Sequence, residues 1–229
     1  NELWWCFNSL LSNRILSMSF DIKWEDKVYK KKRQINNYPF DWVVSSVSKH
    51  ISKKKKSVAV ELGCGTGNNL EFLSGYGYSK IIGVDGSKSA IEYSKKKFKK
   101  NKKIILIQAD FSNTFFENVD LFLDRGSVTH NSKKNKKKIF KNILLQLNSG
   151  GFFMSSLFSK KHDGFKDKKG ANFFAKEMKI KNGIVASFFE EKEIRSLFIK
   201  FNIISLTEEV KHDKITNKRT SMWNIVCKK

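Results

Sequence analysis

The residues with the clearest chemical capacity lie in a run where Gly63, Gly65 and Gly67 follow an apolar segment that begins at Val58 and ends in Glu61. Glycine at alternate positions lets the backbone bend sharply and approach a ligand closely, because no Cβ intervenes. A carboxylate at Glu61 would repel a pyrophosphate and would favour a ligand with a cationic amine. The run therefore predicts a turn that binds a small cationic ligand.

The segments around this turn alternate between strand and helix patterns. Short apolar runs predict five strands, and helical spacing or capping residues such as Ser87 predict the helices between them. Such alternation indicates a parallel sheet with helices on both faces. The predicted strands begin at Val58 and cover residues 81–85, 104–107, 119–124 and 152–158, and one predicted helix covers residues 136–147.

The last third of the chain has a different pattern. Residues 162–170 form a charged stretch long enough for a lid or substrate loop. Ser187 and Glu190 have the spacing of a capping box, which predicts a helix that begins there. Residues 203–210 and 221–227 then predict two strands joined by a polar hairpin.

Composition restricts the class of protein. The chain has 229 residues, 40% of them hydrophobic, which suits one globular domain. No apolar run reaches the roughly 20 residues needed to span a bilayer, and the short apolar start at residues 3–11 is expected to pack on the domain. Cys6, Cys64 and Cys227 are far apart and form no disulfide framework or metal pair, which fits a reducing cytoplasm. No metal site is expected.

The net charge of +23 has two interpretations. A balance this basic is typical of proteins that bind nucleic acid. The excess, however, is mostly lysine in runs, which also occurs as a solvated, compositionally biased surface. The runs at 53–56 and 95–103 precede predicted strands, whereas 133–138 and 160–169 follow strands. Charge on two opposite edges of the sheet favours the solvated-surface interpretation.

Over residues 36–227 the chain resembles the class I S-adenosylmethionine-dependent methyltransferases. The family's acid-x-Gly-x-Gly-x-Gly motif is present at residues 61–67, and its later motifs are present as Asp85-Gly86-Ser87, Asp110-Phe111, residues 120–127 and residues 147–151. The resemblance implies a Rossmann-like α/β fold with a seven-stranded, mostly parallel sheet, helices on both faces and a C-terminal antiparallel hairpin. It also implies two parts: an N-terminal extension or lid at 1–35 and the methyltransferase domain at 36–229.

The resemblance implies S-adenosylmethionine as cofactor and assigns roles to individual residues. Glu61 would favour the cationic methionine end, Asp85 would accept both ribose hydroxyls, and Asp110 would accept from the adenine amino group. As a structural alternative, Asp85 caps a helix and Cys64 only fills space. The expected cofactor-binding residues are Glu61, Gly63, Cys64, Gly65, Gly67, Asp85, Gly86, Ser87, Asp110, Phe111 and Asp124.

Methyl transfer needs an oriented acceptor and, where required, a base. The candidates are His130, His162 and Asp124, with ordinary loop histidines as the alternative, and Arg125 would bind an anionic acceptor or pair with Asp124. No Asp-Pro-Pro-aromatic element, Pro-Cys or acid cluster follows the fourth strand. These absences favour a small-molecule O- or N-methyltransferase over a tRNA or rRNA methyltransferase. A non-catalytic S-adenosylmethionine-binding module and an NAD oxidoreductase remain as weaker alternatives.

Overall fold

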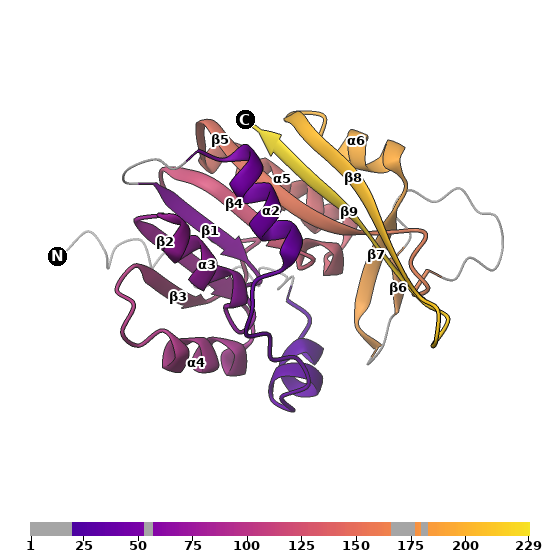
Figure 1. The fold of residues 1–229 in the computed structure, drawn as a ribbon, viewed down its shortest axis with the longest axis horizontal. Helices are drawn as coiled ribbons and strands as arrows, with labels where there is room; N and C mark the ends of the chain where they lie inside the picture. The colour runs from indigo at the N-terminus through magenta and orange to yellow at the C-terminus, as the bar shows by residue number, and fades with distance from the viewer. Residues whose placement is uncertain (1–19, 53–56, 166–176, 180–182) are drawn as a thin grey trace, which may run out of the picture.

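The structure is a computed structural model that describes residues 20–52, 57–165, 177–179 and 183–229 (Figure 1). The apolar start at residues 3–11, the lysines at 53–56 and most of the charged stretch at 162–170 lie outside the described residues. Within the described ranges, no helix combines the length and apolar character needed to cross a membrane.

Five parallel strands form the centre of the fold in the order β3-β2-β1-β4-β5. Their inner members are almost completely buried, as expected for strands covered on both faces. The alternation predicted from the sequence is confirmed, and β5 begins five residues earlier than expected. The strands are β1 (Val58–Leu62), β2 (Lys80–Asp85), β3 (Ile104–Gln108), β4 (Val119–Arg125) and β5 (Leu147–Ser159).

Helices cover both faces of this sheet (Figure 1). On one face α2 (Asp41–His50), α3 (Asn68–Tyr76) and α4 (Lys88–Lys97) bury a shared apolar cluster against the strands. On the other face α5 (Lys133–Gln146) and α6 (Glu191–Leu197) pack on an aromatic cluster. The sheet therefore has a buried layer on each side, and its strand ends are the part left open for a site.

The predicted C-terminal hairpin is confirmed. Strands β8 (Asn202–Asp213) and β9 (Lys218–Lys228) are antiparallel to each other, and β9 pairs antiparallel with residues 152–158 of β5. Figure 1 shows this long hairpin beside the parallel strands. The α/β fold class expected from the sequence is therefore confirmed.

A second hairpin was not predicted. Strand β6 (Glu177–Lys179) pairs antiparallel with β7 (Val185–Phe189), and the end of β7 pairs in parallel with the end of β5. In the part of the chain that the structure describes, the sheet therefore has nine strands rather than seven.

This hairpin shows that the expected capping box at Ser187 was wrong. Ser187 lies inside β7, where Phe188 is fully buried and stacks on Phe158 with ring centroids 5.4 Å apart. The capping box is instead made by Glu190 and Glu193, and α6 follows it. Burial of the aromatic side chain in the sheet outweighs the local capping signal of Ser187.

Two short helices complete the part of the fold that positions the site. The π-helix η1 (Trp24–Tyr29) precedes α2, and the 3-10 helix η2 (Val128–His130) follows β4 directly. Residues of β7 contact η2, so the unpredicted hairpin lies beside the carboxyl end of β4.

Candidate active site

The glycine turn after β1 has the conformation that its sequence requires. Gly63, Gly65 and Gly67 have φ angles of 67°, 53° and 75°, a region that side chains other than glycine rarely adopt. A Cβ on Gly63 would lie 2.3 Å from the Cβ of Ser127, so the turn is also in close contact with the segment after β4. The backbone N–H groups of Gly63 and Cys64 both donate to the carbonyl of Val84, which ties the turn to β2.

Asp85, the last residue of β2, also forms a hydrogen bond to the glycine turn. Its Oδ2 accepts from the N–H of Gly65 at 2.9 Å, and its Oδ1 accepts from the N–H of Ser87 at 2.8 Å. Burial raises the pKa of Asp85 to about 6, against the opposing effect of these two hydrogen bonds. Ser87 in turn caps α4, because its hydroxyl accepts from the N–H of Ala90. Asp85 therefore joins β2, the glycine turn and α4.

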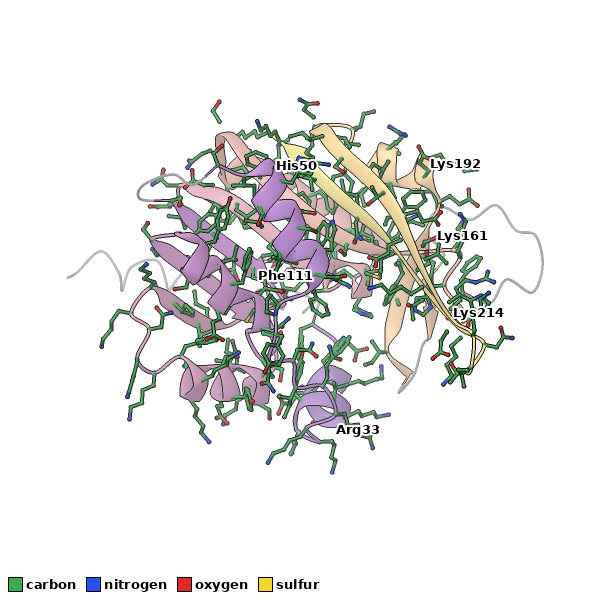
Figure 2. The ribbon with its side chains drawn as sticks, viewed as in Figure 1. Arg33, His50, Phe111, Lys161, Lys192 and Lys214 are labelled. Carbon is green, nitrogen blue, oxygen red and sulfur yellow. The ribbon has the colours of Figure 1, made fainter. Side chains whose placement is uncertain are left out.

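A cleft of about 650 Å³, measured out to its open mouth, lies over these elements. Figure 2 shows Phe111, which lines the cleft, and Arg33 on the segment before α2. Five of the expected cofactor-binding residues line the cleft: Gly63, Asp85, Gly86, Asp110 and Phe111.

Glu61 lies behind the glycine turn with an incomplete set of hydrogen bonds. The carboxyl is 2% exposed, and its Oε1 accepts from Nδ2 of Asn69 at 2.6 Å. Its Oε2 is buried without a hydrogen-bond partner among the described residues. Burial raises the pKa of Glu61 to about 8, and the nearby acids Asp124 and Asp85 add to the effect. A buried, unsatisfied carboxyl is costly, and a cationic group would relieve that cost.

The residues that line the cleft do not include Glu61, Cys64, Gly65, Gly67 or Ser87. The thiol of Cys64 is 2% exposed and packs among apolar residues of the α3 face, and burial raises its pKa well above the ordinary value. Any contact that Cys64 makes to a ligand must therefore come from its backbone.

Asp124 holds the turn that follows β4. Its Oδ1 accepts from the N–H and hydroxyl of Ser127 and from the N–H of Val128, and its Oδ2 accepts from the hydroxyl of Ser155. The side chain is fully buried and does not line the cleft. Its hydrogen bonds shape the wall formed by residues 125–131.

His130 is the candidate base that lines the cleft. Its Nδ1 donates to the carbonyl of Val185 in β7 at 2.9 Å, which leaves Nε2 with the lone pair. The ring meets Trp24 edge-on with centroids 4.9 Å apart. Burial lowers the pKa of His130 to about 4, so the imidazole is neutral at pH 7.

His162 has a different environment. Its Nδ1 accepts from the N–H of Gly164 at 2.8 Å, and its ring packs on Phe158 and Phe188. Since it does not line the cleft, the structure does not bring the two candidate histidines together at one point.

The segment before α2 covers the part of the cleft beside the glycine turn and the start of α4. The carboxylate of Glu25 accepts from the hydroxyl of Ser87 at 2.6 Å and from the N–H and hydroxyl of Ser89. The ring of Phe20 packs on Gly86, where a Cβ would lie 2.2 Å from it. The hydroxyl of Tyr29 lies against Gly65 in the same way. The sequence did not indicate a role for Phe20 and Glu25, because the residues that they contact on α4 and before it lie some 60 positions later in the chain.

The comparisons with known proteins agree with this geometry. Residues 59–151 match the family described as methyltransferase domain, a span that contains the glycine turn, Asp85, Asp110 and η2. A search of curated proteins finds no significant match.

Solved structures with the same fold include S-adenosylmethionine-dependent methyltransferases from Mesorhizobium loti and Anabaena variabilis. The first has a TM-score of 0.67 and 15% identity, over 81% of this chain and 96% of the other. The second has a TM-score of 0.64 and 18% identity, over 91% and 95%. A third is the Burkholderia thailandensis 1,6-didemethyltoxoflavin-N1-methyltransferase, with a TM-score of 0.68 and 15% identity over 88% and 83%.

The buried carboxyl of Glu61 predicts a pH-dependent stability. Between about pH 4.5 and 8 the folded protein retains a proton that the unfolded chain releases, so this group lowers the free energy of unfolding as the pH rises. Glu61→Gln cannot ionise. Its free energy of unfolding, measured by chemical denaturation, should rise relative to that of the unmodified protein by up to about 4 kcal/mol from pH 4.5 to pH 8.5. Glu92→Gln, at an exposed position on α4, is the control. If the free energy of unfolding depends on pH in the same way in all three proteins, Glu61 is not the group responsible.

Proposed function

We propose that this chain, which has the fold of the class I S-adenosylmethionine-dependent methyltransferases, transfers a methyl group to an oxygen or nitrogen atom of a small molecule. The set of residues that line the cleft supports this proposal. The cleft brings Asp85, Gly86, Asp110 and Phe111 together beside a glycine turn, and the span that matches the methyltransferase domain family contains all of them.

The residues present fit the cofactor. The orphaned Oε2 of Glu61 suits a cationic amine, and Asp85 presents a carboxylate at the cleft wall for hydroxyl groups. Asp110 and Phe111, after β3, would contact the adenine. When bound, S-adenosylmethionine supplies a methyl group already activated on a sulfonium, so the protein has mainly to orient the acceptor and exclude water.

Two observations support a small acceptor. The cleft is covered by residues 20–29, with Phe20 and Trp24 in its lining, which favours a small acceptor over a large one. The structure of the Burkholderia enzyme has 1,6-didemethyltoxoflavin bound together with S-adenosylhomocysteine.

We propose His130 as the residue closest to the acceptor. Its neutral imidazole would accept a hydrogen bond from the acceptor at Nε2 and orient it, since a pKa of about 4 makes it a weak base at pH 7. Asp124 would act by holding the turn that carries His130, and His162 would support β5 and β7.

The charge of +23 favours RNA as the second candidate acceptor. Figure 2 shows Lys161, Lys192 and Lys214 around the β8–β9 hairpin and Arg33 on the segment before α2. Positive charge in separate regions is less suited to one continuous nucleic-acid groove than to a solvated surface.

The methyl acceptor can be tested directly. Cell extract separated into small-molecule, RNA and protein fractions should receive a tritiated methyl group mainly in the small-molecule fraction. Label in the RNA fraction, with binding that weakens steeply as salt is raised, would replace this proposal by the RNA alternative.

Asp85→Ala tests the cofactor assignment. Loss of the charge-assisted hydrogen bonds of the carboxylate should weaken S-adenosylhomocysteine binding about 10- to 100-fold in calorimetric titration. Asp213→Ala, at an exposed aspartate at the end of β8, should bind as the unmodified protein does. Unchanged binding by Asp85→Ala would refute the assignment.

Residues 20–35 are proposed as a lid, and Glu25→Gln tests this role. The variant loses the charge of the carboxylate that docks on Ser87 and Ser89 at the start of α4. Release of S-adenosylhomocysteine should become roughly tenfold faster in stopped-flow measurements, because the docked form is less stable. Glu92→Gln, farther along α4, is the control. An unchanged release rate would show that the segment does not act as a lid.

A further inference from the structure

Arg125 is a partly buried cation that lines the cleft and forms no ion pair with a carboxylate among the described residues. Its Nε is buried and has no hydrogen-bond partner, and no ion pair joins its guanidinium to the part of the chain that the structure describes. One face of the guanidinium lies over the ring of Phe40, 4.3 Å from the centroid. Burial of a charge without a partner is costly, so an unpaired arginine in a cleft indicates a ligand.

The neighbouring acids are already engaged. Asp124, the next residue along the chain, uses both oxygens to hold Ser127, Val128 and Ser155. Glu209 and Asp41 also contribute favourable charge near Arg125, but each pairs with Lys211, at 2.8 Å and 3.8 Å. The expected alternative of an Arg125–Asp124 pair is therefore absent among the described residues.

A second buried polar group on the same wall lacks a partner. Asn131 is 5% exposed and lines the cleft. Its Nδ2 donates to the carbonyl of Ser127 at 3.3 Å, while its Oδ1 has no partner among the described residues. Two unsatisfied groups, a donor and an acceptor, therefore belong to one wall of one cleft.

The order of the strands separates this wall from the cofactor residues. Asp85 ends β2 and Asp110 follows β3, on one side of β1, whereas Arg125 ends β4 on the other side. Phe40, which supports the guanidinium, precedes α2 and lies outside the cofactor motifs. Arg125 is thus placed on the side of the glycine turn where the acceptor would bind.

We propose that the methyl acceptor carries an oxyanion, a carboxylate or a phosphate, and that Arg125 binds this group. Guanidinium presents N–H donors in a planar fork that matches either oxyanion, and the ring of Phe40 keeps the fork in place. The unpartnered Oδ1 of Asn131 accepts a hydrogen bond from an N–H or O–H of the same molecule. This inference rests on the proposed function and restricts its substrate class.

The test uses the full chain saturated with S-adenosylhomocysteine and three probes of similar shape: benzoate, phenyl phosphate and neutral benzamide. In ligand-observed NMR, at least one anion should bind ten or more times more tightly than benzamide. The two anions distinguish carboxylate from phosphate recognition. Arg125→Gln should lose this preference, and Arg125→Lys should retain part of it. Arg195→Gln, at an exposed arginine paired with Glu191 on α6, should behave as the unmodified protein does.

The outcomes separate this inference from the proposed function. Equal binding of the anions and benzamide, or an anion preference that survives Arg125→Gln, overturns the inference alone. If Arg125→Gln weakens S-adenosylhomocysteine binding as much as anion binding, Arg125 serves the cofactor and the inference is again overturned. If the unmodified protein does not bind S-adenosylhomocysteine, the proposed function fails, and the inference fails with it.

Discussion

The carboxylate of Asp85 is the constraint on which the part of the cleft beside the glycine turn depends. One oxygen holds the N–H of Gly65 in the glycine turn, and the other holds the N–H of Ser87 at the start of α4. Three elements that are separate in the sequence therefore keep a fixed geometry around one buried group. Burial disfavours the charged form of Asp85 and raises its pKa. The two backbone hydrogen bonds favour the carboxylate and oppose this effect.

Glu61 adds a second electrostatic constraint. With a pKa of about 8, it is mostly protonated at neutral pH in the absence of a cation. A cationic ligand that approaches Oε2 would favour the ionised form, so ligand binding and proton release are coupled at this residue. The same carboxyl therefore destabilises the free protein at high pH and would favour a cationic group that reaches Oε2.

The sequence predicted the parts of the site that depend on local pattern. Glycines at alternate positions and acids at strand ends require particular backbone conformations, and the φ angles at Gly63 and the strand end at Asp85 agree with that prediction. The contact of Phe20 with Gly86 and the isolation of Arg125 depend instead on which distant segments pack together. The capping signal at Ser187 failed for the same reason, since tertiary burial decides between strand and helix there.

The β6–β7 hairpin supports the wall of the cleft formed by residues 125–131. The carbonyl of Val185 holds His130, and Ser187 bonds both Thr129 and the buried amine of Lys136. This support comes from residues after 176, beyond the segment that matches the methyltransferase domain family. Under the proposed function, substitutions in the hairpin would therefore alter which molecule is accepted and leave the glycine turn and Asp85 unchanged.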